Sequence, residues 1–159
     1  MPTDPRIAAL IPHRDPFLWV DRIIDSRPGV IITEKDIQED LDIFRGHYPG
    51  RPLFPGVLLC EAIFQTAALL TALMESGKPQ ENSSRLPVIT RISGARFKRT
   101  VIPGDTIQME VELKETISSA QFFKGTIRVH GKIALKMDFA TTFVAPEKKN
   151  HTTTKKTIA

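Results

Sequence analysis

The chain has 159 residues, of which 41% are hydrophobic and 25% charged, a composition typical of one soluble globular domain with a buried core. Its formal net charge is +4, and lysines near the C-terminus carry part of this charge. A basic charge that is so small and so local argues against a nucleic-acid partner and fits an acidic protein partner better. A single cysteine, Cys60, excludes an internal disulfide, and no secretory signal is apparent, so we expect a cytoplasmic protein.

The N-terminal part of the chain is expected to end in a β-hairpin. Residues 1–16 are interpreted as irregular, because prolines interrupt any long element there. Two β-rich segments, 17–25 and 30–33, flank a turn signal at 26–29. This arrangement predicts the first two strands of a sheet.

A loop rich in proline and glycine begins at Gly46 and leads into the most apolar segment of the chain. Residues 57–74 are apolar enough to raise the question of a membrane span, but Glu61 would be costly inside lipid. The segment is therefore predicted to be a buried core helix, and no membrane partner is expected. Gly77 is expected to end it, before a polar loop over 78–85.

From Leu86 onward, apolar residues alternate with polar ones, which is the pattern of half-buried strands. Strands are expected over residues 95–99, 107–114, 123–130 and 133–139. We predict an α+β domain over residues 1–145, in which an antiparallel sheet covers one long central helix. The polar tail over 146–159 is expected to be disordered.

The start of the predicted helix carries groups suited to acid and oxyanion chemistry. The first N–H groups, near Gly56 and Val57, have no partner within the helix and can stabilise a developing oxyanion or bind a substrate carbonyl. Glu61 is the only charged side chain between Arg51 and Glu75. Burial favours its protonated form, which suits a general acid, although a structural carboxylate at a dimer seam is the alternative.

His47 lies in the stiff loop before this helix, where an imidazole can act as a base at physiological pH. A lone loop histidine is more commonly just exposed. His130 and His151 are interpreted as solvated, and His13 as a structural hydrogen-bonding residue rather than a catalyst. No histidine, cysteine or carboxylate cluster has metal-ligand spacing, and no phosphate-binding glycine motif occurs, so neither a metal nor a cofactor is expected.

Over roughly residues 8–145 the chain resembles the 3-hydroxyacyl-[acyl-carrier-protein] dehydratases of type II fatty acid synthesis. The motifs that carry the resemblance lie at residues 11–18, 20–22, 46–52, 55–58, 61–62, 95–99 and 101–105. The resemblance implies a hotdog fold, in which the sheet wraps the central helix. It also implies homodimers whose sheets join, commonly assembled as trimers of dimers, with the active site at the dimer interface.

The resemblance also implies roles for individual residues. His47 would be the catalytic base, Glu61 of the other subunit the acid, and the Gly56 N–H the donor that holds the thioester carbonyl. The reaction would convert a (3R)-3-hydroxyacyl chain on acyl-carrier protein into a trans-2-enoyl chain and water. The basic stretch of Arg96, Lys98 and Arg99, with Arg91 nearby, is suited to meet the acidic carrier protein or its phosphopantetheine phosphate, with an ordinary solvated strand edge as the alternative. Phe64, on the same helix face as Glu61, would border the substrate's acyl tunnel.

Departures from the family pattern leave other functions open. Phe64, Tyr48 and Lys136 differ from what the family usually has, which leaves room for a dehydratase of a specialised acyl or polyketide pathway. A hotdog acyl thioesterase, with Glu61 activating water, is an alternative that the pairing with His47 argues against. A non-enzymatic acyl-binding partner with a closed tunnel is the third possibility.

Overall fold

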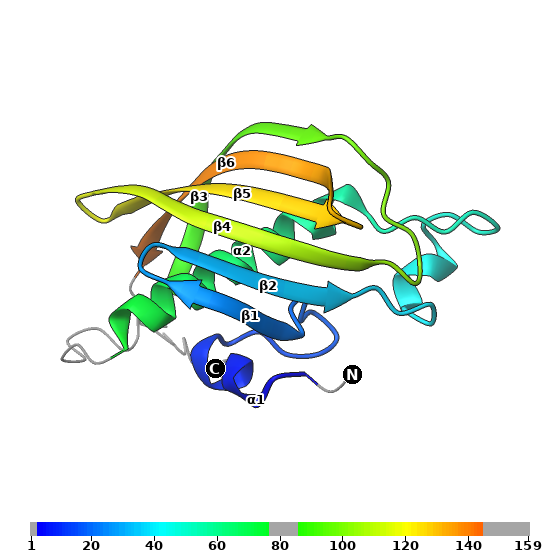
Figure 1. The fold of residues 1–159 in the computed structure, drawn as a ribbon, viewed down its shortest axis with the longest axis horizontal. Coiled ribbons are helices and arrows are strands. Elements are labelled where there is room, and N and C mark those ends of the chain that lie inside the picture. Colours follow the sequence, from blue (N-terminus) through cyan, green and yellow to red (C-terminus); the bar gives the residue numbers. More distant parts are fainter. Residues whose placement is uncertain (1–2, 77–85, 145–159) are drawn as a thin grey trace, which may run out of the picture.

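One long helix lies against the inner face of an antiparallel sheet in the computed structural model, which describes residues 3–76 and 86–144 (Figure 1). The elements in chain order are α1 (Pro5–Leu10), β1 (Arg22–Arg27), β2 (Val30–Asp36), the 3-10 helix η1 (Asp42–Arg45), α2 (Gly56–Glu75), β3 (Leu86–Phe97), β4 (Thr106–Ile117), β5 (Ala120–Val129) and β6 (Lys132–Val144). The described residues form a six-stranded sheet in the order β1-β2-β4-β5-β6-β3. All its pairings are antiparallel, so the predicted α+β architecture is confirmed.

A short helix, α1, lies in the N-terminal segment, where the prediction of irregular structure is wrong. The Asp4 carboxylate accepts a hydrogen bond from the Arg6 N–H at 2.9 Å and caps the helix start. Pro5 begins the helix, where a missing N–H removes no helical hydrogen bond. Ile7 is fully buried, and α1 packs against α2, which brings the residues after α1 close to the central helix.

The first hairpin is confirmed, but β1 begins at Arg22 rather than near Phe17. The side chain of Gln65 on α2 holds the intervening segment. Its Oε1 accepts from the Trp19 N–H at 2.8 Å, and its Nε2 donates to the Phe17 carbonyl at 2.9 Å. Because these backbone groups bond to a helix side chain, they are not available to a neighbouring strand.

The apolar segment forms α2, a core helix as predicted. In its most apolar stretch, 56% of the residues are buried, although the helix is long and apolar enough to cross a membrane. The helix ends at Glu75, and Ser76 adopts an extended backbone. The predicted helix stop at Gly77, the polar loop 78–85 and the tail 146–159 lie outside the described residues.

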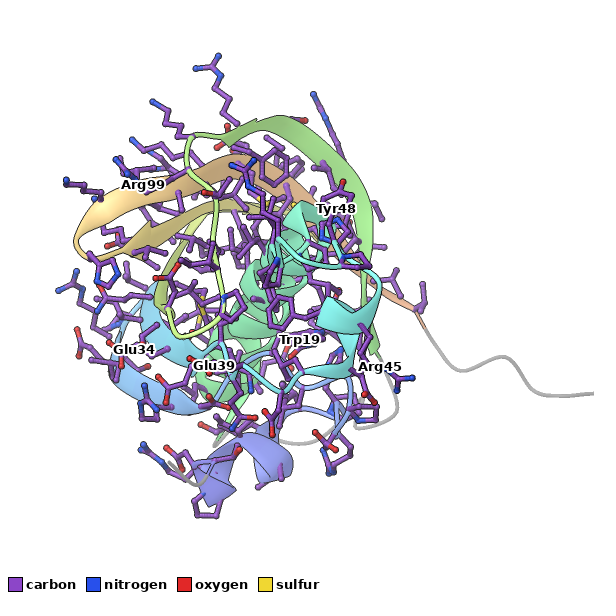
Figure 2. All side chains as sticks on the ribbon, turned by 90° about the vertical axis from the view of Figure 1, so that its right-hand side faces the viewer. Trp19, Glu34, Glu39, Arg45, Tyr48 and Arg99 are labelled. Carbon is purple, nitrogen blue, oxygen red and sulfur yellow. The ribbon has the colours of Figure 1, made fainter. Side chains whose placement is uncertain are left out.

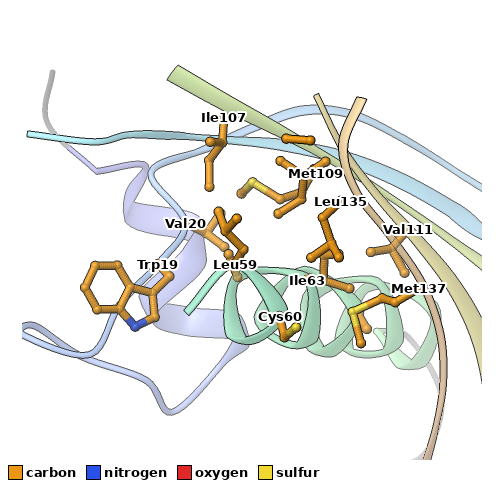
Figure 3. Close-up of a cluster of buried hydrophobic side chains, with 14 of the residues drawn as sticks. Trp19, Val20, Leu59, Cys60, Ile63, Ile107, Met109, Val111, Leu135 and Met137 are labelled. Carbon is orange, nitrogen blue, oxygen red and sulfur yellow. The ribbon is translucent and has the colours of Figure 1, made fainter. Parts of the chain in front are cut away.

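The predicted strands are confirmed and are longer overall, but β3 ends at Phe97 rather than at 99, and β5 ends at Val129, so that His130 lies in a turn. The turn between β5 and β6 places His130 and Gly131 at φ values of 48° and 72°. Figure 3 shows Ile63 of α2 facing Met109, Leu135 and Met137 of the sheet in the core. These contacts fix α2 against the middle of the sheet.

Candidate active site

A cavity of about 290 Å³ lies along the side of α2 that faces the start of β3. Glu61, Phe64, Ala68 and Thr71 line it from the helix. These positions are three or four residues apart, so they share one helix face. His13 contributes from the N-terminal segment, and Phe123 and Thr141 contribute from the sheet.

The carboxylate of Glu61 is oriented by Gln65, one turn further along α2. Gln65 Nε2 donates to Glu61 Oε1 at 2.9 Å, and the Gln65 side chain is fixed by its bonds to the backbone of Phe17 and Trp19. The Glu61 side chain is 22% exposed, so it is half-buried rather than enclosed as the sequence predicts. A carboxylate held this way at a cavity wall is well placed to exchange a proton with a ligand.

His13 lies beside this carboxylate, with its Nε2 3.6 Å from Glu61 Oε1. Its Nδ1 is buried and has no hydrogen-bond partner among the described residues, so the structure does not bear out a structural hydrogen-bonding role for that atom. Sequence reasoning missed this contact. His13 and Glu61 are far apart in the chain, and only the packing of α1 on α2 and the bonds of Gln65 bring the two together.

His47 lies in the loop between η1 and α2, and its Nδ1 is 2.9 Å from the carbonyl oxygen of Leu53. A carbonyl only accepts, so Nδ1 carries the proton in the neutral ring, and Nε2 keeps a free lone pair. The Tyr48 ring packs on the imidazole with ring centroids 4.3 Å apart, and Figure 2 shows Tyr48 on this loop. The imidazole therefore has the tautomer that a base acting through Nε2 requires.

Within one chain, the structure does not bring His47 and Glu61 together. His47 is absent from the lining of the cavity that contains Glu61. In the part of the chain that the structure describes, no hydrogen bond or ion pair joins the two side chains. A single subunit therefore does not place the two predicted catalytic groups in one cavity.

The N-terminus of α2 is the predicted oxyanion-binding position. Pro55 precedes the helix and provides no side-chain cap, and Gly56 is its first residue. The hydrogen bonds of the described residues include none from the N–H groups of Gly56 and Val57. A Cβ on Gly56 would lie 2.9 Å from Cε1 of Phe97, and the Val57 side chain is 74% exposed.

Phe64 lines the cavity and packs edge-on against Phe139, with ring centroids 5.1 Å apart. Phe139 in turn stacks on Phe123. The middle of the cavity is therefore bordered by aromatic rings. Residues 3–76 and 86–144 contain no group of three or more histidines, cysteines and carboxylates arranged to hold a metal ion.

Residues 11–138 match the family model described as a FabA-like domain. Among curated proteins, the chain is 38% identical over 134 residues to "3-hydroxyacyl-[acyl-carrier-protein] dehydratase FabZ" of Anaeromyxobacter sp. (strain K), covering 84% of this chain and 85% of the relative. It is 41% identical over 138 residues to the protein of that name from Janthinobacterium sp. (strain Marseille), covering 86% and 87%. The Chloroflexus aggregans protein of that name is 47% identical over 109 residues, covering 68% and 72%.

Solved structures share the fold at low sequence identity. "The Dehydratase Heterocomplex ApeI:P from Xenorhabdus doucetiae" superimposes with a TM-score of 0.73 at 17% identity, covering 89% of this chain and 91% of that chain. A hypothetical thioesterase from Streptococcus pneumoniae, solved with coenzyme A, gives a TM-score of 0.57 at 12% identity, covering 80% and 88%. These likenesses concern the fold alone.

Proposed function

The chain belongs to the FabA-like family and is a hotdog-fold 3-hydroxyacyl-[acyl-carrier-protein] dehydratase, and on this premise we propose that His47 and Glu61 of two different subunits carry out its reaction. The reaction removes water from a 3-hydroxyacyl chain in fatty acid biosynthesis and leaves an enoyl chain. The names of the curated relatives favour this function over the thioesterase alternative.

In the proposed mechanism, His47 acts as the base. The bond from its Nδ1 to the Leu53 carbonyl leaves Nε2 free to take a proton from C2 of the substrate. The electron pair of that C–H bond moves toward the thioester carbonyl. The N–H groups at Gly56 and Val57 hold the oxygen on which negative charge develops, because they have no partner in the helix and lie at its positive end.

Glu61 acts as the acid in this mechanism. It protonates the 3-hydroxyl group, the C3–O bond breaks, and the electron pair from C2 forms the double bond, so that water leaves. Gln65 holds the carboxylate at the cavity wall, where Phe64 borders the acyl chain. Return of the proton from His47 to Glu61 through solvent restores both groups.

We place this site at the interface of a homodimer, and one observation carries the proposal: His47 does not line the cavity that contains Glu61. The edge strand β3 supports it. This strand is 12 residues long, and its apolar side chains Ile92 and Phe97 are 53% and 54% exposed. A long apolar edge strand invites pairing with a second chain. Pairing through β3 would bring the partner's loops to the cavity, and trimers of such dimers remain a further proposal.

The carrier protein is proposed to dock beside β3. Arg91, Arg96, Lys98 and Arg99 are all exposed there, and Figure 2 shows Arg99 beside the sheet. Such a basic surface attracts an acidic protein and its phosphate-bearing arm. Because α2 is a buried core helix and the relatives belong to fatty acid biosynthesis, a cytoplasmic location is proposed.

Mixed dimers test whether the site is shared between subunits. His47→Ala and Glu61→Gln are each expected to lower hydration of an enoyl thioester by about 100-fold or more, since each removes an acid–base group. In a statistical mixture, half of the dimers are hybrids with one intact site, so roughly a quarter of the wild-type activity should return.

Two differently tagged His47→Ala subunits, mixed in the same way, serve as the control and should stay inactive. Tag-based purification establishes that hybrids have formed. Hybrids with no recovered activity would place both groups of each site in one subunit and overturn the shared-site proposal. Full activity in either single variant would overturn the residue roles.

A further inference from the structure

The far end of the cavity differs chemically from its middle. Glu61 and Thr71 line its two ends from α2, and the helical rise places them roughly 15 Å apart. Phe64, Ala68 and Phe123 border the part between them and are apolar. Beyond them, the wall is lined by Thr71 and Thr141, both of which have a hydroxyl group.

One of these hydroxyl groups is unsatisfied. Thr141 is 5% exposed, and its Oγ1 is buried with no hydrogen-bond partner among the described residues. Thr71 is also 5% exposed, and its Oγ1 donates to Oε1 of Gln121 at 3.3 Å. A buried hydroxyl without a partner costs free energy, and such groups in folded proteins call for an explanation.

The sheet register shows where Thr141 lies. Thr141 on β6 is paired with Gln121 on β5, and Phe139, two residues earlier, contacts Phe64 of α2. Because side chains alternate along a strand, Thr141 lies on the same inner face as Phe139. Thr142 lies on the opposite face, where its Oγ1 bonds to Ser119. Thr141, whose hydroxyl has no partner, is therefore on the face that borders the cavity.

We propose that Thr141 and Thr71, the latter held by Gln121, bind an uncharged hydrogen-bonding group, such as a hydroxyl, at the distal end of the acyl chain. The inference rests on the proposed function, because Glu61 defines where the reacting end of the chain lies. An uncharged group fits better than a carboxylate, since no basic side chain lines this end of the cavity within the described residues, and a buried charge needs a partner. The enzyme would thus select chains by the chemistry of their far end.

Matched substrates test the selection. Pairs of 3-hydroxyacyl-[acyl-carrier-protein] substrates have the same length and end in either a methyl or a hydroxyl group. At the length that brings the end to Thr141, the hydroxyl-ended substrate should have a kcat/KM about tenfold higher, because it satisfies a group that the methyl leaves unpaired. Shorter pairs, which cannot reach Thr141, should show no such preference.

Thr141→Val removes the hydroxyl and keeps the shape, so it should abolish the preference between the two members of the pair whose ends reach position 141. Thr142→Val, on the opposite face, is the matched control and should keep the preference. Equal kcat/KM within every pair, or a preference that survives in Thr141→Val, would overturn the inference.

Failure of the proposed function gives a different result, which is no turnover of any substrate. The pocket is then tested by binding alone, with the same pairs as 3-hydroxyacyl-pantetheine thioesters. The hydroxyl-ended ligand should raise the melting temperature of the wild type more than the methyl-ended one, and Thr141→Val should remove the difference. Equal shifts in the wild type would overturn the inference independently of catalysis.

Discussion

The contact between Gly125 and Ile63 sets how closely α2 approaches the sheet. Gly125 lies on β5, and a Cβ built on it would be 2.5 Å from Cγ2 of Ile63 and 3.0 Å from its Cδ1. Rotation about χ2 moves Cδ1 away but leaves Cγ2 where it is. The χ1 angle of isoleucine in a helix has one strongly preferred value, so Cγ2 cannot move aside either. Gly125→Ala must therefore push the helix off the sheet.

The cost follows from the size of the displacement. Carbon atoms pack at about 3.5–4.0 Å, so α2 or β5 must move by about 1 Å to admit the new methyl group. Overpacking of this kind lowers the free energy of unfolding by about 1–3 kcal/mol. Because the groups on both sides are rigid, we expect Gly125→Ala to lower it by about 3 kcal/mol. For a chain of this size, the melting temperature should fall by about 6–12 °C.

A double-mutant cycle with Ile63→Ala tests this reasoning by urea unfolding. Ile63→Ala alone should cost about 2–5 kcal/mol through the cavity it leaves. In the double variant the new methyl enters that cavity, so the pair should be more stable than the sum of the two losses by about 2 kcal/mol. Gly46→Ala is the control, since a Cβ there meets no atom within 4 Å. Additive losses, or a Gly125→Ala protein as stable as the control, would refute the steric argument.

Three further variants probe polar groups. Arg22 holds the pKa of Asp36 well below its usual range, so this carboxylate stabilises the fold above its unfolded pKa and the contribution is lost as pH falls. Asp36→Asn should therefore lower the unfolding free energy by about 1–2 kcal/mol at pH 7 and by less at pH 3, as measured by urea titration. Burial raises the pKa of the Cys60 thiol, so a disulfide reagent should label it slowly in the native protein and rapidly in urea, and fast native labelling would contradict the burial. In Gln65→Leu, the Trp19 N–H loses its partner and Glu61 loses the hydrogen bond that orients it. The unfolding free energy, measured by thermal melts, should therefore fall by about 2–3 kcal/mol, and kcat should fall at least tenfold.

The sequence predicts a strand wherever the burial of one face makes apolar and polar residues alternate along the chain. Ile107, Met109 and Val111 alternate with polar residues and are all fully buried, so β4 could be recognised from its pattern. Over most of β3 the alternation is too weak to mark a strand, because this edge strand exposes side chains on both faces, and only its end near Ala95 is predicted. The helix α1 is short and depends on a cap and on one buried residue, Ile7, signals too weak to outweigh nearby prolines.

The site is predictable only where its residues lie on one element. Spacing along α2 correctly places Glu61 and Phe64 on one face. Contacts between distant segments leave no such pattern. His13 reaches Glu61 through tertiary packing, and Thr141 lies near Thr71 because its partner in the sheet, Gln121, accepts a hydrogen bond from Thr71. Spacing also makes His47 and Glu61 look like a pair within one chain, which the structure does not bring together.

The two sides of α2 divide stability from chemistry. Ile63 packs against Gly125 in the core, whereas its neighbour Phe64 lines the cavity. Substitutions at the Ile63–Gly125 contact should therefore change unfolding free energy first, and those that line the cavity should change turnover first. Gln65 is the exception, because it joins the N-terminal segment to α2 and also orients Glu61. A buried side chain that does both ties the catalytic carboxylate to the folding of the N-terminal segment, so loss of that segment should disable the site even if the sheet and the helix stay intact.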